Sequence, residues 1–372
     1  MLATESLNQF FETMRYVVLS LDYEIFGNGT GDVRQHMVTP TERMARIADQ
    51  YHLPLTVFVE MEEILAFERN AAVLQRQCGY DPYSLVRRQI EDLARRGHDA
   101  QLHLHPQWHQ ASFEAGRWRL DETKPTVDSL FGSGEAAAQY IGSRKAALEE
   151  IAGNSAKRAT VYRAGAFSAQ PGTKLISALV ENEFRIDSSV VHGLHCQDEN
   201  VCLDYRQAPA GKSTWRVQTD VAVEDCEGGL WEVPITSIPG RRLNQLTLGR
   251  LKAKFSRNVP REQQRRMVKQ LGVERNPLQL LSFLWQRVPL KLDFHNVSSR
   301  KLLSWIRSVP EPAPGALDVV VLIGHTKEHL DDRAFDRLLQ GLKMEPELRV
   351  VSFHDIAEKL PLLRTQKVPR LC

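Results

Sequence analysis

Residues 84–105 read SLVRRQIEDLARRGHDAQLHLH, and this stretch joins a helix pattern directly to a strand pattern. Its apolar residues first recur at helical spacing, and Gly97 is typical of the position that follows a helix C-terminus. Apolar and polar residues then alternate through 99–105, as they do in a strand whose two faces differ. A helix that leads into a strand in this way is part of a βαβ unit, from which parallel sheets are built.

The same succession of elements continues in both directions along the chain. Residues 16–21 (YVVLSL) form an apolar run that predicts a buried strand, and residues 55–59 (LTVFV) form a second one. Further strands are predicted C-terminal to the quoted stretch, at 159–163, 185–188, 289–294, 317–323 and 349–353. The sequence therefore predicts an α/β fold with a parallel sheet.

Residues 241–286 interrupt this rhythm, because they read as helical and basic. We expect a helical insertion or cap there, within a single domain that spans residues 1–372. The most basic part, residues 257–275, is interpreted as a solvated helix face, and the alternative is a surface that binds phosphate or lipid headgroups.

Composition limits the partners of the chain. The net charge is only +2, with 25% charged residues, so the charge balance does not indicate nucleic acid or a membrane surface. No apolar run is long enough to span a bilayer, and the N-terminal stretch MLATESLNQFFETMRY lacks the apolar region of a secretory signal. The five cysteines form no Cys-x-x-Cys pair. We therefore expect a reduced, cytoplasmic setting.

Polar residues stand where two of the predicted strands end. Asp22 and Glu24 follow the first strand, and His103 and His105 end the quoted stretch. Each pair is spaced by two, so each pair shares one face of an extended segment. Ordinary solvated acids are the alternative for the first pair. Two imidazoles on one face suit a divalent metal such as zinc, and His98 and His109 are further site candidates that are each better explained as structural.

Three later strand ends also carry polar groups. Arg163 precedes a glycine and can pair with a carboxylate, Asp187 ends the strand 185–188, and His325 follows Gly324 directly. A histidine in such a position can donate a proton to a leaving amine, and the alternative is a loop-capping role. Because active sites of parallel barrels gather at the carboxyl ends of strands, these groups are expected to converge.

The ordered set of motifs LSLDYE, GHDAQLHLH, YRAGAF, IDSSV and LIGHTK resembles the polysaccharide deacetylase family, also called the NodB-homology or carbohydrate esterase family 4 group. The resemblance runs from about residue 15 to residue 329 and implies a distorted (β/α)7-type barrel. The chain departs from the family pattern at three positions: Tyr23 separates the two acids, Gln107 stands where the second metal histidine is usual, and Gly165 stands where proline is usual. The phrasing looks closest to the subgroup found in bacterial O-antigen and other surface-polysaccharide clusters.

The resemblance implies a metal-dependent N-deacetylase. Asp22 would be the base and Arg163 its partner, His325 would be the acid, and Asp187 would belong to the fourth motif. The metal ligands would be Glu24, His103 and His105, with His109 as an alternative to His105, and the ion would be a divalent metal, most simply Zn²⁺. The implied substrate is an N-acylated sugar, free, nucleotide-linked or lipid-linked, in O-antigen or lipopolysaccharide synthesis.

Two other functions remain open at this point. A glycoside hydrolase on a related barrel would use two carboxylates, for example Asp22 with Asp187 or Glu232. A catalytically inactive sugar-binding homologue would keep the fold without the metal. Metal content and sensitivity to chelation discriminate among the three.

Overall fold

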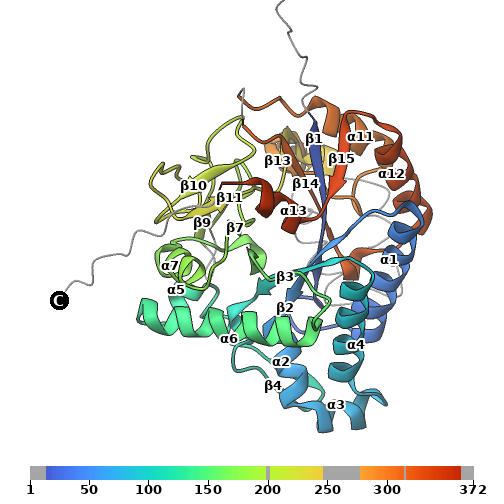
Figure 1. Ribbon diagram of the computed structural model, residues 1–372, viewed down its shortest axis with the longest axis vertical. Helices are drawn as coiled ribbons and strands as arrows, with labels where there is room; N and C mark the ends of the chain where they lie inside the picture. The colour runs from blue at the N-terminus through green and yellow to red at the C-terminus, as the bar shows by residue number, and fades with distance from the viewer. Residues whose placement is uncertain (1–13, 198–201, 246–276, 314–315, 362–372) are drawn as a thin grey trace, which may run out of the picture.

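The computed structural model describes residues 14–197, 202–245, 277–313 and 316–361. Its centre is a nine-stranded sheet in the order β10-β11-β7-β6-β3-β2-β1-β14, with β15 paired to the N-terminal half of β1 (Figure 1). All pairings in this sheet are parallel except that of β10 with β11. The strands are β1 (Arg15–Tyr23), β2 (Thr56–Glu60), β3 (Asp99–Leu104), β6 (Val161–Ala164), β7 (Ile186–Asp187), β10 (Trp215–Val217), β11 (Leu230–Glu232), β14 (Val319–His325) and β15 (Leu348–Val351).

The sheet curls so that its two ends approach each other. Thr236 donates its backbone N–H to the carbonyl oxygen of Val321 in β14, and the neighbouring Ile235 pairs with Val191, shortly after β7. The predicted α/β fold with a curled, barrel-like sheet is therefore confirmed. The predicted strand at 289–294 is placed differently: β13 (Arg287–Lys291) pairs with β12 (Ser237–Arg241) in a separate two-stranded antiparallel sheet, and only Asp293 bridges to β14.

Helices cover the outside of this sheet, as Figure 1 shows. The quoted stretch forms α4 and β3 as predicted, although α4 begins earlier because Asp81 caps it and Pro82 opens it. The larger helices are α1 (Thr39–Tyr51), α2 (Met61–Arg69), α3 (Ala71–Cys78), α4 (Pro82–Arg95), α6 (Gly134–Ala152), α7 (Thr173–Glu181), α10 (Pro277–Trp285), α11 (Ser299–Ser308), α12 (Asp332–Met344) and α13 (Phe353–Lys359).

Alternation along β1 divides the core into two parts. Val17, Leu19 and Leu21 belong to the large cluster that includes residues of the covering helices, whereas Val18 belongs to a second cluster with Phe58. That second cluster fills the inside of the curled sheet and includes α13, whose Phe353 ring meets Phe58 edge-on. Ser20 and Asp22 continue the Val18 face of β1. Their side chains therefore point into the interior of the curled sheet, and Asp22 does so near the carboxyl end of the strand.

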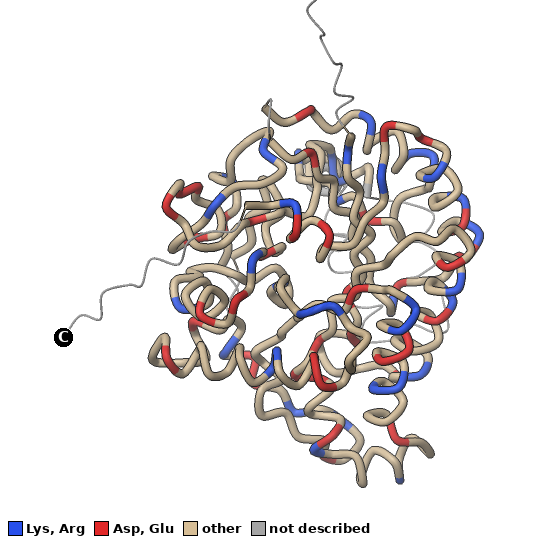
Figure 2. The backbone as a smooth tube through the Cα atoms, viewed as in Figure 1, with Lys and Arg blue, Asp and Glu red and all other residues tan. Residues whose placement is uncertain are grey.

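Several predictions fall wholly or partly outside the described residues. The expected insertion at 241–286 includes residues 246–276, and the basic stretch 257–275 lies within them, so both stay predictions, as does the single domain over 1–372. Among the described residues, no helix combines the length and the apolar character that crossing a bilayer requires. Basic and acidic residues are interspersed along the described chain (Figure 2).

Candidate active site

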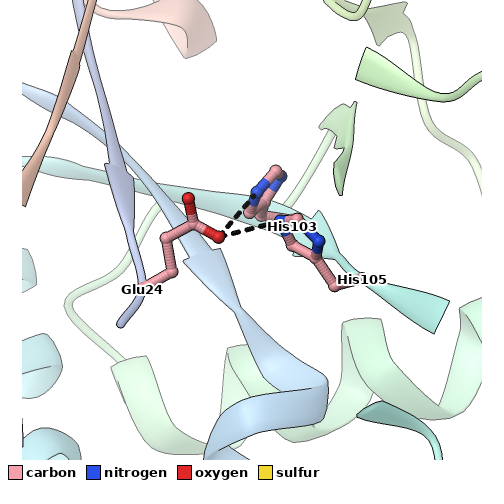
Figure 3. Close-up of side chains that lie close together, drawn as sticks. All are labelled: Glu24, His103 and His105. Carbon is pink, nitrogen blue, oxygen red and sulfur yellow. Dashed lines mark ion pairs between the residues drawn. The ribbon is translucent and has the colours of Figure 1, made fainter. Parts of the chain in front are cut away.

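Three side chains from two strands converge at one point inside the mouth of the sheet. Glu24 follows β1, His103 lies in β3, and His105 follows β3 directly. Glu24 Oε2 lies 2.8 Å from His105 Nε2 and 3.8 Å from His103 Nε2 (Figure 3). All three residues are buried, and their exposed fractions are 4%, 1% and 6%. The structure thus brings together the three residues that the sequence proposed as metal ligands.

The facing atoms of this group have no hydrogen bonds. Within the described chain, Glu24 Oε2, His103 Nε2 and His105 Nε2 are buried polar atoms that make none. Buried polar atoms are normally paired, so three unpaired ones aimed at a common point call for an explanation. Two imidazole nitrogens and one carboxylate oxygen form a donor set typical of zinc and similar divalent ions. The residues present therefore fit a divalent metal.

Surrounding groups fix the two imidazole rings. The Nδ1–H of His103 donates to the carbonyl oxygen of Arg163 at 2.9 Å, which leaves Nε2 as the atom with the free electron pair. The side-chain amide of Gln107 lies 3.2 Å from His105 Nδ1. Burial lowers the pKa of His105, which favours the neutral, metal-binding form of its ring. Gln107, which replaces the usual second histidine, thus supports the histidine that lies at the site.

Gly165 makes room for His105. A Cβ atom at position 165 would lie 2.4 Å from Cγ of the His105 ring, closer than real Cβ contacts allow. The chain turns sharply here, and the next two residues, Ala166 and Phe167, both have positive φ angles, of 50° and 62°. Gly165, which stands where the family usually has proline, therefore leaves the space that the His105 ring occupies.

His109 and His98 lie elsewhere. The ring of His109 contacts Glu62 at 3.6 Å and Arg144 at 3.2 Å, so His109 is outside the metal group. His98 Nδ1 accepts the backbone N–H of Leu55, and burial lowers its pKa to about 4. Both contacts agree with the structural interpretation of these two histidines.

Asp22 lies beside the metal group and is held by a buried arginine. Arg163 Nη1 donates to Asp22 Oδ1 at 2.6 Å, and the expected ion pair is therefore present. Arg163 is fully buried, donates also to Ser20 Oγ and the carbonyl oxygen of Ser188, and stacks on Phe58. Burial opposes ionisation of Asp22, but Arg163 together with the smaller contributions of His103 and His325 outweighs it, so the pKa of Asp22 is lowered. Asp22 is thus kept as a carboxylate.

His325 approaches Asp22 from the other neighbouring strand. The β1–β14 register places the two residues directly opposite each other, and His325 Nε2 lies 3.5 Å from Asp22 Oδ2. Gly324 is required before it, because a Cβ there would lie 2.3 Å from the Phe294 ring. The His325 side chain is 15% exposed, more than the 3% of Asp22, so its ring stands at the solvent side of the pair.

Two acids that the motifs did not assign surround His325. Asp293 and Glu328 each offer a carboxylate oxygen within 4.8 Å of a ring nitrogen of His325, and Asn296 donates to both acids. Asp293 stands near the end of the predicted strand 289–294. An acid at the end of a predicted strand is the sequence feature that could have identified it as a site residue. Glu328 gave no such signal, because it lies in the short 3-10 helix Thr326–Glu328 that follows His325.

Asp187 is not brought to this group. It is fully buried, and its Oδ1 accepts the hydroxyl of Ser189. It stands opposite Glu232 in the β7–β11 pairing, and burial together with the charge of Asp187 raises the pKa of that residue. Among the described contacts, Arg163 links Asp187 to the site only through longer-range charge interaction.

A cavity of about 960 Å³ lies between α11 and α12 and borders the His325 side of the site. Glu328 and His295 line it, whereas Glu24, His103 and His105 do not. The cavity is therefore an additional space next to the His325 cluster, separate from the metal group.

No protein-family model and no curated protein matches the chain. Several solved structures do match the chain. A protein of Mycobacterium smegmatis described as a polysaccharide deacetylase is 17% identical, with 96% of each chain covered and a TM-score of 0.46. A protein of Pseudomonas aeruginosa PAO1 that is also described as a polysaccharide deacetylase is 13% identical over 93% of this chain and 91% of that one, with a TM-score of 0.41. A 4-alpha-glucanotransferase of Thermococcus litoralis is 9% identical over 93% and 40%, with a TM-score of 0.47.

Proposed function

We propose that this protein is a metal-dependent hydrolase that removes an N-acyl group, most simply acetyl, from an amino sugar. The observation that carries the proposal is the convergence of three buried, unbonded donor atoms from Glu24, His103 and His105 beside the Asp22–Arg163 pair. When bound by these three residues, a divalent ion such as Zn²⁺ supplies Lewis acidity towards the acyl oxygen and towards water.

The remaining side chains supply the proton transfers of amide hydrolysis. Asp22 takes a proton from the attacking water, whose oxygen forms the new bond to the acyl carbon. Arg163 keeps Asp22 ionised and oriented through the 2.6 Å contact. His325 gives a proton to the sugar nitrogen as the carbon–nitrogen bond breaks, which releases a carboxylate and a free amine. Asp293 and Glu328 lie beside the ring, on the side from which the sugar nitrogen would receive this proton.

The substrate class is proposed from the motif resemblance. We assign the enzyme to the synthesis of bacterial surface polysaccharide, such as O-antigen or lipopolysaccharide, in the cytoplasm. Its substrate is then an N-acyl sugar that is free, nucleotide-linked or lipid-linked. The small net charge of +2 supports a substrate other than nucleic acid.

The geometry disfavours a two-carboxylate glycosidase. Asp187 and Glu232 are both fully buried and stand opposite each other in the β7–β11 pairing, so neither faces a sugar. Asp22 is bound to Arg163 and lies beside donor atoms that suit a metal.

Metal analysis followed by acetate release from a panel of N-acetyl sugars tests the proposal. We expect about one divalent ion per chain and loss of activity on chelation, since the ion supplies the Lewis acid. Asp22→Asn should abolish turnover while metal content stays the same, because it removes proton acceptance and keeps the shape. Absence of metal, or hydrolysis that continues in the presence of a chelator, would contradict the proposal.

A further inference from the structure

A largely buried lysine contacts the other oxygen of the acidic metal ligand. Lys327 Nζ donates to Glu24 Oε1 at 2.7 Å and to the carbonyl oxygen of Ile25 at 2.9 Å. The side chains of Lys327 and Glu24 are only 11% and 5% exposed. Glu24 thus has one oxygen engaged by an ammonium group, whereas its second oxygen, Oε2, faces the two imidazoles without a hydrogen bond.

This contact balances the charge of the acidic ligand before any ion enters. The charge of Glu24 is balanced by Lys327, and that of Asp22 by Arg163. In the neutral form that binds a metal, the two histidines contribute no charge. A dication in such a site keeps most of its charge, whereas a site with a surplus of carboxylates would partly neutralise it. Lys327 also stands close enough to repel a dication.

Resting on the proposed function, we propose that Lys327 tunes the metal centre by restricting Glu24 to one-oxygen ligation and by opposing the charge of the ion. As a consequence, the protein binds the metal with lower affinity, and the bound ion is more electrophilic. In a partly buried site, charge repulsion at this range exceeds what one oriented hydrogen bond contributes. Loss of the ammonium group should therefore tighten metal binding even though an ordering contact is lost.

Titration of the metal-free protein with Zn²⁺ alone, compared with turnover, tests this inference. Lys327→Met keeps the length of the side chain without its charge, and Lys327→Gln keeps a hydrogen-bond donor without the charge. We expect both variants to bind Zn²⁺ about 10-fold or more tightly, because each removes a unit charge next to the ion. We expect turnover to fall in both, and the Co²⁺ absorption of Lys327→Met to weaken as a further oxygen joins the ion.

Lys145 offers a matched control. It is also buried, and its Nζ donates to the carbonyl oxygen of Asn182 at 2.6 Å, outside the metal group. Lys145→Met should leave the Zn²⁺ affinity unchanged. A purely structural role for Lys327 would lower affinity and turnover together, and that result, or unchanged affinity, would overturn the inference while the proposed function stands. If neither wild type nor variants bind Zn²⁺ or Co²⁺, the proposed function fails, and this inference fails with it.

Discussion

At the scale of single residues, the contact between Gly165 and His105 ties a backbone position to the metal group. A Cβ at position 165 would overlap the imidazole, and the rigid backbone of β6 and the following turn limits relief by movement. Gly165→Ala should therefore displace His105 and weaken Zn²⁺ binding about 10-fold or more, as disturbance of a ligand's support typically does. Isothermal titration of the apo protein measures this change.

Gly132→Ala is the control for that substitution. No atom lies within 4 Å of the Cβ that it would introduce, and its φ angle needs no glycine. Its Zn²⁺ affinity should equal that of the wild type. Equal affinity in Gly165→Ala would show that His105 is not held against position 165.

His325 provides a second test at this scale, because its proposed role depends on the leaving group. His325→Ala should reduce turnover of an N-acyl sugar about 100-fold or more, as loss of general acid catalysis does. An ester of the same sugar should lose much less, since an alkoxide departs more readily than an amide anion. The two rates, measured on matched amide and ester substrates, give the comparison. Equal losses on both substrates would point to a binding or structural role.

At the scale of elements, local patterns were enough to predict most of the parallel strands and two of the side-chain pairs. Spacing by two placed Asp22 with Glu24 and His103 with His105, because alternation in a strand is a local property. Contacts between distant elements could not be predicted in this way. Lys327 reaches Glu24 across 303 positions of sequence, and no local pattern distinguishes it from a solvated lysine.

The assignment of Asp187 illustrates the same limit. Asp187 ends a predicted strand, as Asp22 does, yet β7 and β11 together bury it against Glu232. Asp293, not Asp187, is the strand-end acid that lies beside His325. Its segment continues from β13 and bridges to β14. Pairing between strands decides which of several strand-end acids reaches the site.

At the scale of the whole molecule, the Asp187–Glu232 pair makes stability depend on pH. Burial and the charge of Asp187 raise the pKa of Glu232 well above the ordinary 4.5, so the folded chain holds a proton that the unfolded chain releases. This contribution to stability is complete below pH 4.5 and is lost as pH rises through the folded-state pKa. Glu232→Gln should therefore show a smaller fall in unfolding free energy between about pH 5 and 8 than the wild type.

Urea unfolding at several pH values measures this difference between the two proteins. Glu227 is exposed, so Glu227→Gln should follow the wild-type pH dependence and serves as the control. Parallel curves for wild type and Glu232→Gln would mean that the buried pair shares no proton.

The pairing of β1 with β14 also has a consequence during synthesis on the ribosome. One edge of β1 can pair with β2 soon after β2 emerges from the ribosome. The other edge pairs with β14, which is synthesised about 300 residues later. At about 5–20 residues per second, that edge waits roughly 15–60 s. An unpaired apolar edge recruits other strands, so the nascent chain is open to aggregation throughout this interval. Both the shelter of this edge and the meeting of Asp22 with His325 therefore depend on the last fifth of the chain, and premature termination before β14 would yield neither.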